Sequence, residues 1–317
     1  MMDERCLRVG SRGSALARWQ AEAVRAGLPG PSELALVATA GDQQPDAPLG
    51  ADNPVGFFTK EIERALLDGR VDLAVHSLKD LPIEQPPGLE LVALLARDAP
   101  ADLLLVRPEA LDAKRDFPLR PDAVVGASSM RRQALLGALR PDLQPRAIRG
   151  NVPTRIDKCR RGDYDAVLLS RAGPERLRLD FAPLLGFDLN PQRWPGSPGQ
   201  AVVAVQARGD DAEALRRAAA VDCAATRQLV AAERALHAVF GGGCHAPFGA
   251  YASAGPDGFS LVVAAPDAEQ RMRLARFAHT ELDAALEQAS AWVRAGRPPR
   301  ASAPNEPWLN RAARPWR

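Results

Sequence analysis

The chain has 317 residues and a formal net charge of +2, in which 37 arginines and 4 lysines stand against 39 acidic residues. This length predicts two or three domains with hydrophobic cores, and the near-neutral charge argues against a nucleic-acid-binding protein. A run of about twenty apolar residues is absent from the sequence, which excludes a membrane-spanning helix. The acidic start at residues 1–5 leads straight into a strand-like segment, so we expect no secretory signal.

The N-terminal part of the chain alternates between predicted strands and predicted helices. The strands are expected at residues 7–10, 34–39, 71–75, 89–95 and 102–106, and the helices at 15–26 and 57–67. A second unit begins near residue 100 and repeats this pattern. Its strands are expected at 123–126, 146–148, 165–169 and 201–207, its helices at 130–139 and 153–161, and a proline- and glycine-rich connector at 191–200. The alternation is typical of an α/β architecture with a largely parallel sheet.

The last third of the chain changes character. A long alanine-rich helix is expected at 222–239, strands at 248–253, 259–264 and 272–277, and a helix at 282–295. This order predicts an α+β domain with a small antiparallel sheet. The tail from Arg297 onward is rich in proline and polar residues, so we expect it to be loosely ordered.

Three strand-to-helix turns carry arginines, at residues 11–14, 126–132 and 149–155. The N–H groups and the dipole of a helix N-terminus favour an anion. A simple helix cap explains the serines of these turns equally well, and a solvated charge pair is the alternative for Arg131 and Arg132. In α/β folds, however, ligands bind at the carboxyl ends of strands. The three turns together therefore predict a ligand with several carboxylates or phosphates.

The motif HSLKDLP at residues 76–82 follows a predicted buried strand and places Lys79 and Asp80 at the same cleft. An ordinary salt-bridged loop is one interpretation of this motif. The other is that a carboxylate among so many arginines stabilises a cationic intermediate or accepts a proton. We expect His76 to be structural.

The four cysteines are scattered along the chain, without a CxxC pair or zinc-type spacing. We therefore expect free thiols in a reducing cytoplasm, with Cys159 and Cys223 packed on helices. Cys244 follows three glycines and precedes Pro247, so we expect it on a tight loop at a helix exit. It could fill a turn as a small apolar side chain, and it lacks a positioned base for acyl transfer. His245 beside it has no third ligand at a suitable spacing, so the sequence predicts no metal site.

Taken in order, these motifs resemble the porphobilinogen deaminase family, also called hydroxymethylbilane synthases. The match runs from about Leu7 to Gly249 and is weaker beyond. The residues that carry it are 11–14, 39–42, 46–49, 56–61, 76–82, 126–133, 149–155, 232–235 and 242–244. The sequences HSLKDLP, SSMRRQ and RGNVPTR, in that order, are its most specific part.

The resemblance implies two α/β domains like the type II periplasmic binding proteins and a small α+β domain that carries the cysteine. Domain 1 would comprise residues 1–97 and 200–219 and form one half of the active-site cleft. Domain 2 would comprise residues 98–199 and form the arginine-rich half. Domain 3 would comprise residues 220–317.

The resemblance also implies a transferase of haem biosynthesis. Its dipyrromethane cofactor would be built from its own substrate and held by a thioether to Cys244. Four porphobilinogen units would be added head to tail, each with loss of ammonia, before water releases the linear tetrapyrrole. The implied partners are porphobilinogen and the growing chain, bound by a cytoplasmic monomer with no nucleic-acid or membrane partner.

Site residues follow from the resemblance by position. Asp80 would be the catalytic carboxylate that faces the pyrrole nitrogens. The implied cofactor-binding residues are Cys244, Lys79, Asp80, Ser128, Ser129, Arg131 and Arg132. The implied substrate-binding residues are Arg12, Ser14, Arg149, Arg155 and Arg176.

Several positions depart from the family pattern. The departures are Ala40 for arginine, Val55 for lysine, Ala201 for glycine, Gln206 for glutamate, His245 for glutamine and a connector one residue longer. They bear on loop closure, hinge geometry and turnover. The alternative function is therefore a non-catalytic or weakly active clamshell protein that binds an acidic pyrrole-type ligand.

Overall fold

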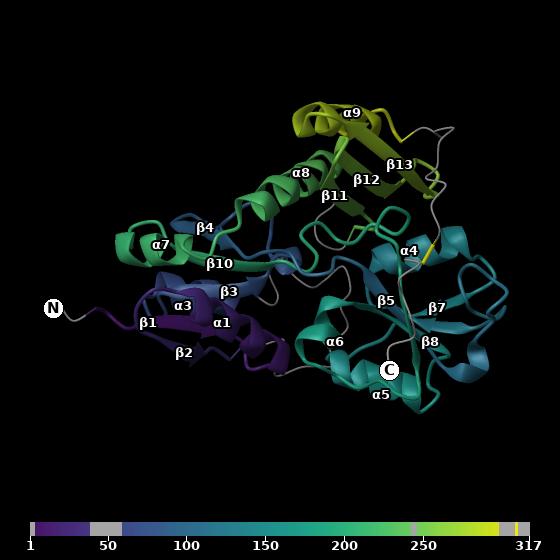
Figure 1. Ribbon diagram of the computed structural model, residues 1–317, viewed down its shortest axis with the longest axis horizontal. Helices are drawn as coiled ribbons and strands as arrows, with labels where there is room; N and C mark the ends of the chain where they lie inside the picture. Colours follow the sequence, from purple (N-terminus) through teal and green to yellow (C-terminus); the bar gives the residue numbers. More distant parts are fainter. Residues whose placement is uncertain (1–3, 39–58, 242–245, 298–307, 310–317) are drawn as a thin grey trace. The chain divides into compact units, whose positions relative to one another are not determined.

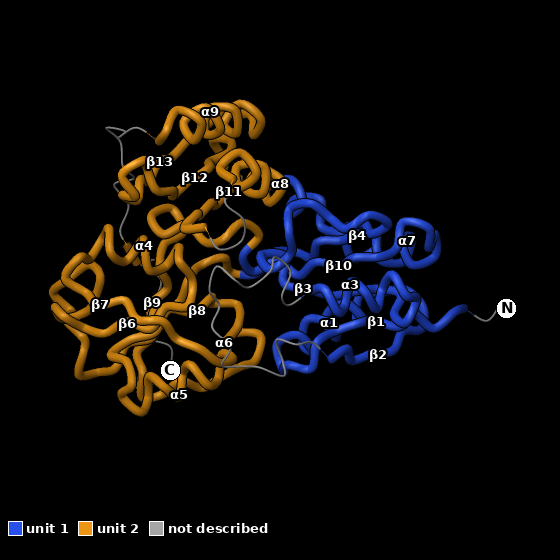
Figure 2. Tube along the Cα trace, turned by 180° about the vertical axis from the view of Figure 1, so that it is seen from behind, with its two compact units in different colours: residues 1–98, 200–228 blue, residues 99–199, 229–317 orange. Residues whose placement is uncertain are grey.

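The computed structural model describes residues 4–38, 59–241, 246–297 and 308–309 (Figure 1). The chain divides into two compact units, which Figure 2 distinguishes by colour. Unit 1 comprises Met1–Asp98 and Gln200–Gln228, and unit 2 comprises Ala99–Gly199 and Leu229–Arg317. The finer division into three domains stays a prediction.

Unit 1 contains a five-stranded sheet in the order β2-β1-β3-β10-β4. Its strands are β1 (Leu7–Ser11), β2 (Ser32–Leu36), β3 (Leu73–Ser77), β4 (Leu89–Leu94) and β10 (Val203–Arg208). β1 pairs in parallel with β2 and β3, whereas β10 runs antiparallel to β3 and β4. Four of the five strands therefore run in the same direction, in line with the prediction of a largely parallel sheet, and β10 is the reversed strand. The sheet is mixed because the chain reaches β10 after it has passed through residues 99–199 of unit 2. A strand–helix–strand crossover, which would make β10 parallel to its neighbours, does not connect it to the sheet.

Helices cover both faces of this sheet. They are α1 (Ala15–Gly27), α3 (Lys60–Leu67) and α7 (Ala212–Ala219). Successive residues of a strand point to opposite faces. Accordingly, Leu73 and Val75 pack in one cluster with residues of α1 and α7, whereas Ala74 between them packs with residues of α3. This burial on both faces explains why the strand reads as a continuous apolar run.

The larger sheet of unit 2 has the order β7-β6-β8-β5-β9. Its strands are β5 (Asp102–Val106), β6 (Val124–Gly126), β7 (Gln144–Arg146), β8 (Ala166–Ser170) and β9 (Leu185–Asp188). β6 is parallel to β7 and β8, while β5 is antiparallel to β8 and β9. The strand directions therefore follow the same scheme as in unit 1, with three parallel strands and then two reversals.

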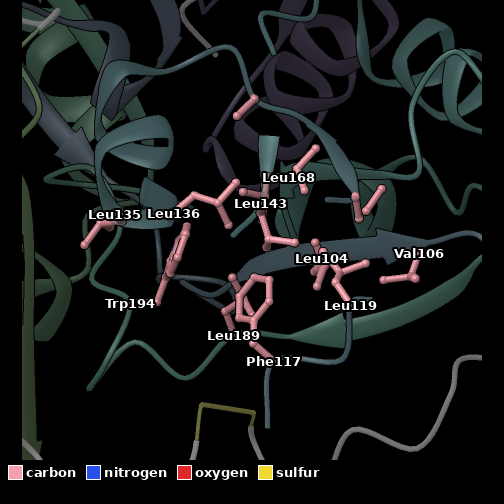
Figure 3. Packing of buried hydrophobic residues seen from close by; sticks show 14 of the residues in the cluster. Leu104, Val106, Phe117, Leu119, Leu135, Leu136, Leu143, Leu168, Leu189 and Trp194 are labelled. Atoms are coloured by element: carbon pink, nitrogen blue, oxygen red, sulfur yellow. The ribbon is translucent and has the colours of Figure 1, made fainter. Parts of the chain in front are cut away.

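Three helices accompany this sheet, namely α4 (Met130–Leu139), α5 (Val152–Arg160) and α6 (Ala172–Arg176). One core cluster, shown in Figure 3, joins Leu104 and Leu168 of the strands to Leu136 of α4 and to the fully buried Trp194. A second cluster uses the alternate strand residues and packs them against Ile156 of α5. The sheet is thus buried on both faces, like that of unit 1.

The remainder of unit 2 is built on an antiparallel sheet in the order β11-β12-β13. The elements are β11 (Gly249–Gly255), β12 (Gly258–Pro266), β13 (Met272–His279), α8 (Ala224–Phe240) and α9 (Leu282–Arg294), and unit 2 includes α8 from Leu229 onward. The predicted fold class, with two α/β sheets and a small antiparallel α+β part, is confirmed. Two short 3-10 helices, η1 (Leu78–Asp80) and η2 (Pro108–Ala110), complete the elements of the described residues. None of the described helices is long and apolar enough to cross a membrane.

Candidate functional site

The carboxyl ends of β1 and β3 lie at the same edge of the unit 1 sheet, because the two strands are parallel neighbours. The turn after β1 holds Arg12 and Ser14. The Ser14 hydroxyl caps α1 by accepting a hydrogen bond from the backbone N–H of Ala17 at 3.3 Å. Ser14 therefore has a structural use, and its substrate-binding role stays a prediction. Arg12 is partly exposed at this edge.

The turn after β3 is the short helix η1, which two buried leucines hold in place. Leu78 is fully buried and its N–H donates to the Val202 carbonyl at 3.0 Å, while Leu81 is buried on the far side of the turn. Lys79 is half-buried between them, and Asp80 is exposed. Among the described residues, none forms a hydrogen bond or an ion pair with the Asp80 carboxylate. The sequence pattern apolar–Lys–Asp–apolar thus presents both charged groups at the strand end.

His76 is buried on β3, and burial lowers the pKa of its imidazole to about 4. It is therefore neutral at physiological pH, in agreement with its expected structural character. Near it, Gln206 is fully buried and its side-chain N–H group donates to Glu63 at 3.2 Å and to Gln85 at 2.7 Å. An amide at position 206 can donate to the Glu63 carboxylate. A glutamate there would place two carboxylates together.

In the larger sheet of unit 2, the turns after β6 and β7 lie at the same edge, because the two strands are parallel neighbours. Ser129 caps α4 by accepting from the Arg132 N–H at 3.2 Å. The Arg155 guanidinium donates to the Ser128 hydroxyl and to the Gly150 carbonyl, both at 2.7 Å. Gly150 adopts φ of 105°, a left-handed conformation that favours glycine. Two predicted site residues, Ser128 and Arg155, are thus in direct contact.

The other predicted arginines of unit 2 differ in burial. Arg149 is partly exposed beside Gly150, and desolvation lowers the pKa of its guanidinium. Arg176 is buried at the end of α6, the helix that follows β8. Because β8 is the other parallel neighbour of β6, this turn belongs to the same edge of the sheet.

Arg131 and Arg132 form a buried ion cluster with Asp102, the first residue of β5. Their exposed fractions are 2% and 5%, and Asp102 is fully buried. Arg132 binds both Asp102 oxygens, at 3.0 and 2.7 Å, and Arg131 binds one of them at 2.9 Å. Carbonyl groups of Leu168 and Pro195 accept the remaining guanidinium bonds, at 3.1 and 2.9 Å.

This cluster contains two guanidiniums and one carboxylate, so it carries an excess positive charge. Burial opposes the ionisation of Asp102, but the two neighbouring guanidiniums outweigh it and hold the pKa of the carboxyl well below its usual range. Burial also lowers the pKa of Arg131, whose Nε–H is buried and has no partner among the described atoms. The unbalanced charge and the orphaned donor fit an additional carboxylate.

Cys244 and His245 lie outside the described residues, but the segments on either side of residues 242–245 are described. α8 ends at Phe240 as expected, and Gly241 follows with φ of 73°. Phe248 stacks on Phe240 with ring centroids 5.0 Å apart. Gly249 then comes so close to its neighbours that a Cβ would lie 2.7 Å from the Pro195 carbonyl oxygen and 3.1 Å from Arg131 Cδ. Gly249 therefore lies beside the ion cluster.

Among the departures, Ala40 and Val55 also lie outside the described residues. Ala201 is described and has φ of 70°, in the left-handed region. A residue with a Cβ is strained there by about 1–2 kcal/mol, whereas glycine is not. The structure thus explains why a glycine is expected at this position.

Sequence reasoning missed two residues of the ion cluster. Asp102 binds both arginines, and the indole N–H of the fully buried Trp194 donates to the same Asp102 carboxylate at 2.8 Å. A signal for Asp102 exists in the sequence, since an acidic residue opens the otherwise apolar run of residues 102–106. Its partners lie 29, 30 and 92 positions away in the chain, which no local pattern indicates.

Two solved structures with periplasmic-binding-protein names are similar to parts of the chain. One is a putative periplasmic sulfonate-binding protein of Methylobacillus flagellatus KT, with a TM-score of 0.41 and 12% identity over 76% of this chain and 71% of its own. The other is a periplasmic binding protein of Salmonella typhimurium with high arginine specificity. It has a TM-score of 0.40 and 12% identity over 69% of this chain and 92% of its own.

Sequence comparison gives a stronger result. The family model described as porphobilinogen deaminase, dipyromethane cofactor binding domain, matches residues 7–216, and the model of the C-terminal domain of that family matches residues 227–287. The porphobilinogen deaminase of Xanthomonas euvesicatoria pv. vesicatoria (strain 85-10) is 44% identical over 252 residues, which cover 78% of this chain and 81% of that protein. The chain therefore belongs to the porphobilinogen deaminase family.

Proposed function

We propose that the chain is a hydroxymethylbilane synthase, which joins four porphobilinogen units head to tail with loss of ammonia and then releases the linear tetrapyrrole. The two family models and the Xanthomonas relative support this function. The proposal extends to the residues. Cys244 would hold the dipyrromethane cofactor, and Asp80 would act on the reacting pyrroles.

The observation that carries the cofactor assignment is the close approach of Gly249 to Arg131, where a Cβ at position 249 would lie 3.1 Å from Arg131 Cδ. Gly249 lies five residues after Cys244 in the chain, and Arg131 belongs to the buried cluster that has an excess positive charge. A carboxylate-bearing group attached to Cys244 would be tethered five residues from this glycine, near a cluster in which the Arg131 Nε–H has no partner among the described atoms. Ser128, Ser129, Arg131, Arg132 and Lys79 are the residues that would hold it.

The donors at the two sheet edges suit a substrate with several carboxylates. Each porphobilinogen carries two carboxylates, and guanidiniums bind carboxylates through paired hydrogen bonds. We assign Arg12, Ser14, Arg149, Arg155 and Arg176 to the substrate and the growing chain. The link from Arg155 to Ser128 connects this set to the residues assigned to the cofactor.

Asp80 is the group that we assign to the chemical step. When bound, the dipyrromethane supplies the pyrrole carbon to which the first substrate unit is joined. Loss of ammonia leaves the substrate with a cationic, electrophilic carbon, and an exposed carboxylate can stabilise that charge and accept an N–H hydrogen bond. The Asp80 carboxylate has no competing partner among the described residues, so it is available for this role.

Intact-mass measurement of the purified protein tests the cofactor assignment. The parent protein should carry an added mass of two pyrrole units, and Cys244→Ser should lack it. Cys223→Ser is the matched control and should keep the added mass. An unmodified parent protein, after expression with ample porphobilinogen, would contradict the assignment and favour a clamshell protein that binds without turnover.

The role of Asp80 is tested by Asp80→Asn, which keeps the shape of the side chain and removes its charge. We expect the attached cofactor mass to remain and kcat to fall by about 100-fold or more, in the range of transition-state charge stabilisation. Glu84→Gln, which changes another exposed carboxylate of the same segment, should leave kcat unchanged. Near-normal turnover by Asp80→Asn would remove Asp80 from the mechanism.

We also propose a monomer in the cytoplasm. The three cysteines within the described residues, Cys6, Cys159 and Cys223, are free thiols, which suits a reducing compartment. Sedimentation equilibrium tests the oligomeric state, and a concentration-dependent dimer would contradict the proposal.

A further inference from the structure

The C-terminal tail contains a short docked segment, Trp308–Leu309, visible in Figure 1 as a yellow stretch between two grey traces. Leu309 forms an antiparallel bridge with Leu189, the residue that follows the edge strand β9. The N–H of Asn190 donates to the Trp308 carbonyl at 2.9 Å. The tail thus continues the pairing at the end of the sheet, in the manner of an added strand.

The Trp308 side chain makes contacts of its own. The Arg193 guanidinium carbon lies 3.7 Å from the centre of the Trp308 ring, a cation–π contact. Trp308 also lines a cavity of about 240 Å³. Its other lining residues are Arg115, Asp116, Phe117, Leu139 and Arg140. Leu309 is partly buried against the core cluster that includes Phe117 and Leu189, which Figure 3 labels.

The surface that receives the tail is a tight turn with a structural task. The Asn190 carbonyl accepts from the N–H groups of Arg193 at 2.9 Å and Trp194 at 2.8 Å, and its side chain accepts from the Gln192 N–H at 3.0 Å. The turn places Trp194 so that its indole N–H donates a 2.8 Å hydrogen bond to the Asp102 carboxylate. Asn190 therefore links the tail on one side to the buried ion cluster on the other.

We propose that Trp308–Leu309 is an intramolecular anchor whose docking onto residues 189–193 holds the turn that places Trp194 on Asp102. The surface formed by Leu189, Asn190 and Arg193 is then an interaction surface, and its partner is the C-terminal segment of the same chain. The backbone bridge fixes the register of the segment, while the Trp308 ring provides its contact area. This role does not depend on which ligand the ion cluster binds.

The amide of Asn190 reports directly on docking, because its hydrogen-bond acceptor is the Trp308 carbonyl. In the full chain, Trp308→Ala should accelerate hydrogen exchange of this amide by about 10-fold or more, since both the ring contacts and the packing of Leu309 are lost. The Trp194 indole N–H should exchange faster too, by a smaller factor. The amide of Val263, in the central strand of the small sheet, should keep its exchange rate.

Two outcomes would overturn the proposal. One is unchanged exchange at Asn190 in Trp308→Ala, which would mean that the tail does not hold the turn. The other is equal acceleration at Asn190 and Val263, which would mean that the substitution destabilises unit 2 as a whole.

Conservative and double variants sharpen this test. Trp308→Phe keeps a ring in the cavity and under the guanidinium, so Asn190 exchange should stay within about 3-fold of the parent. Arg193→Met keeps the aliphatic stem and removes the cation. It should accelerate Asn190 exchange alone but add little to Trp308→Ala, because the two variants remove the same contact. Additive effects, or Trp308→Phe exchanging as fast as Trp308→Ala, would exclude the ring as the anchor.

Discussion

The Arg155 guanidinium donates a 2.7 Å hydrogen bond to the Ser128 hydroxyl and so connects the starts of two helices. Both residues follow parallel neighbouring strands, Ser128 after β6 and Arg155 after β7. A second bond from Arg155 to the Gly150 carbonyl holds the guanidinium in one orientation. The arginine is thus oriented by its neighbours before any ligand arrives, which lowers the entropy lost on binding.

This orientation predicts a graded response to substitution. Arg155→Gln removes a charged donor and should reduce kcat/KM for porphobilinogen by about 10- to 100-fold, since hydrogen bonds to charged groups contribute about 1.5–3 kcal/mol. Ser128→Ala removes the hydrogen bond from Arg155 to the Ser128 hydroxyl but keeps the bond from Arg155 to the Gly150 carbonyl, so it should reduce kcat/KM by less than about 10-fold. Steady-state kinetics measure both effects. If Ser128→Ala were the more damaging variant, Ser128 would itself be the main ligand-binding group.

Asp102→Asn should destabilise the protein strongly. The substitution leaves the buried guanidiniums of Arg131 and Arg132 without their counter-charge, and breaking a buried ion pair costs about 3–5 kcal/mol. Urea unfolding at neutral pH measures the loss. A loss below about 1 kcal/mol would mean that water or another carboxylate reaches the cluster.

The Asp102 carboxyl also makes the free energy of unfolding depend on pH in the acidic range. Because the folded state lowers the pKa of Asp102 below its usual value, its contribution is present above about pH 4 and is lost as the pH falls further. The difference in unfolding free energy between the parent and Asp102→Asn should therefore shrink below about pH 4. A difference that is constant with pH would contradict this assignment.

Ala201→Gly should stabilise the protein. Ala201 has φ of 70°, where an L-residue with a Cβ is strained by about 1–2 kcal/mol. The greater chain entropy of glycine offsets about 0.5–1 kcal/mol of that gain, so we expect a net stabilisation of up to about 1.5 kcal/mol. Gly199→Ala is the matched control, because Gly199 has φ of 73° and should lose stability when a Cβ is added. A destabilised Ala201→Gly would show that the alanine methyl group packs too well to lose.

His76 should make stability depend on pH in a different range. Burial lowers the pKa of its imidazole to about 4, below the unfolded value near 6.5. The neutral form is favoured in the folded state, so stability is complete above about pH 6.5 and falls by up to about 3 kcal/mol as the pH drops to 4. His76→Asn should remove this slope in urea unfolding, and His279→Asn, at an exposed histidine, should keep it. An unchanged slope in His76→Asn would assign it to other groups.

Local signals in the sequence predicted the helix starts well. α1 begins one residue after Ser14 and α4 one residue after Ser129, because each serine caps the helix through its own side chain. In the third arginine-bearing turn Asn151 caps α5 in the same way, whereas the HSLKDLP turn follows β3 without a side-chain cap. The strands β2 and β7 begin two residues before the predicted positions, since apolar runs do not mark where pairing begins.

Pairings between distant segments could not be predicted. The sequence patterns of Arg131 and Arg132 indicated an anion but not its source, and Asp102 is already one such anion inside the fold. The helix α7 and the strand β9 were not predicted from the sequence. Their apolar patterns are short, and each element is stabilised by its contacts with a sheet whose strands are distant in the chain. The antiparallel direction of β10 likewise depends on where the chain returns.

That return has a consequence for the order in which the protein assembles on the ribosome. β10 lies between β3 and β4 in the sheet, yet it is made only after residues 99–199 of unit 2. The nascent β4 has no partner strand until residues 203–208 emerge. All five strands of the larger sheet of unit 2, by contrast, come from one continuous stretch of chain. We therefore expect the larger sheet of unit 2 to close first, and the N-terminal sheet to wait for β10, which joins β3 to β4.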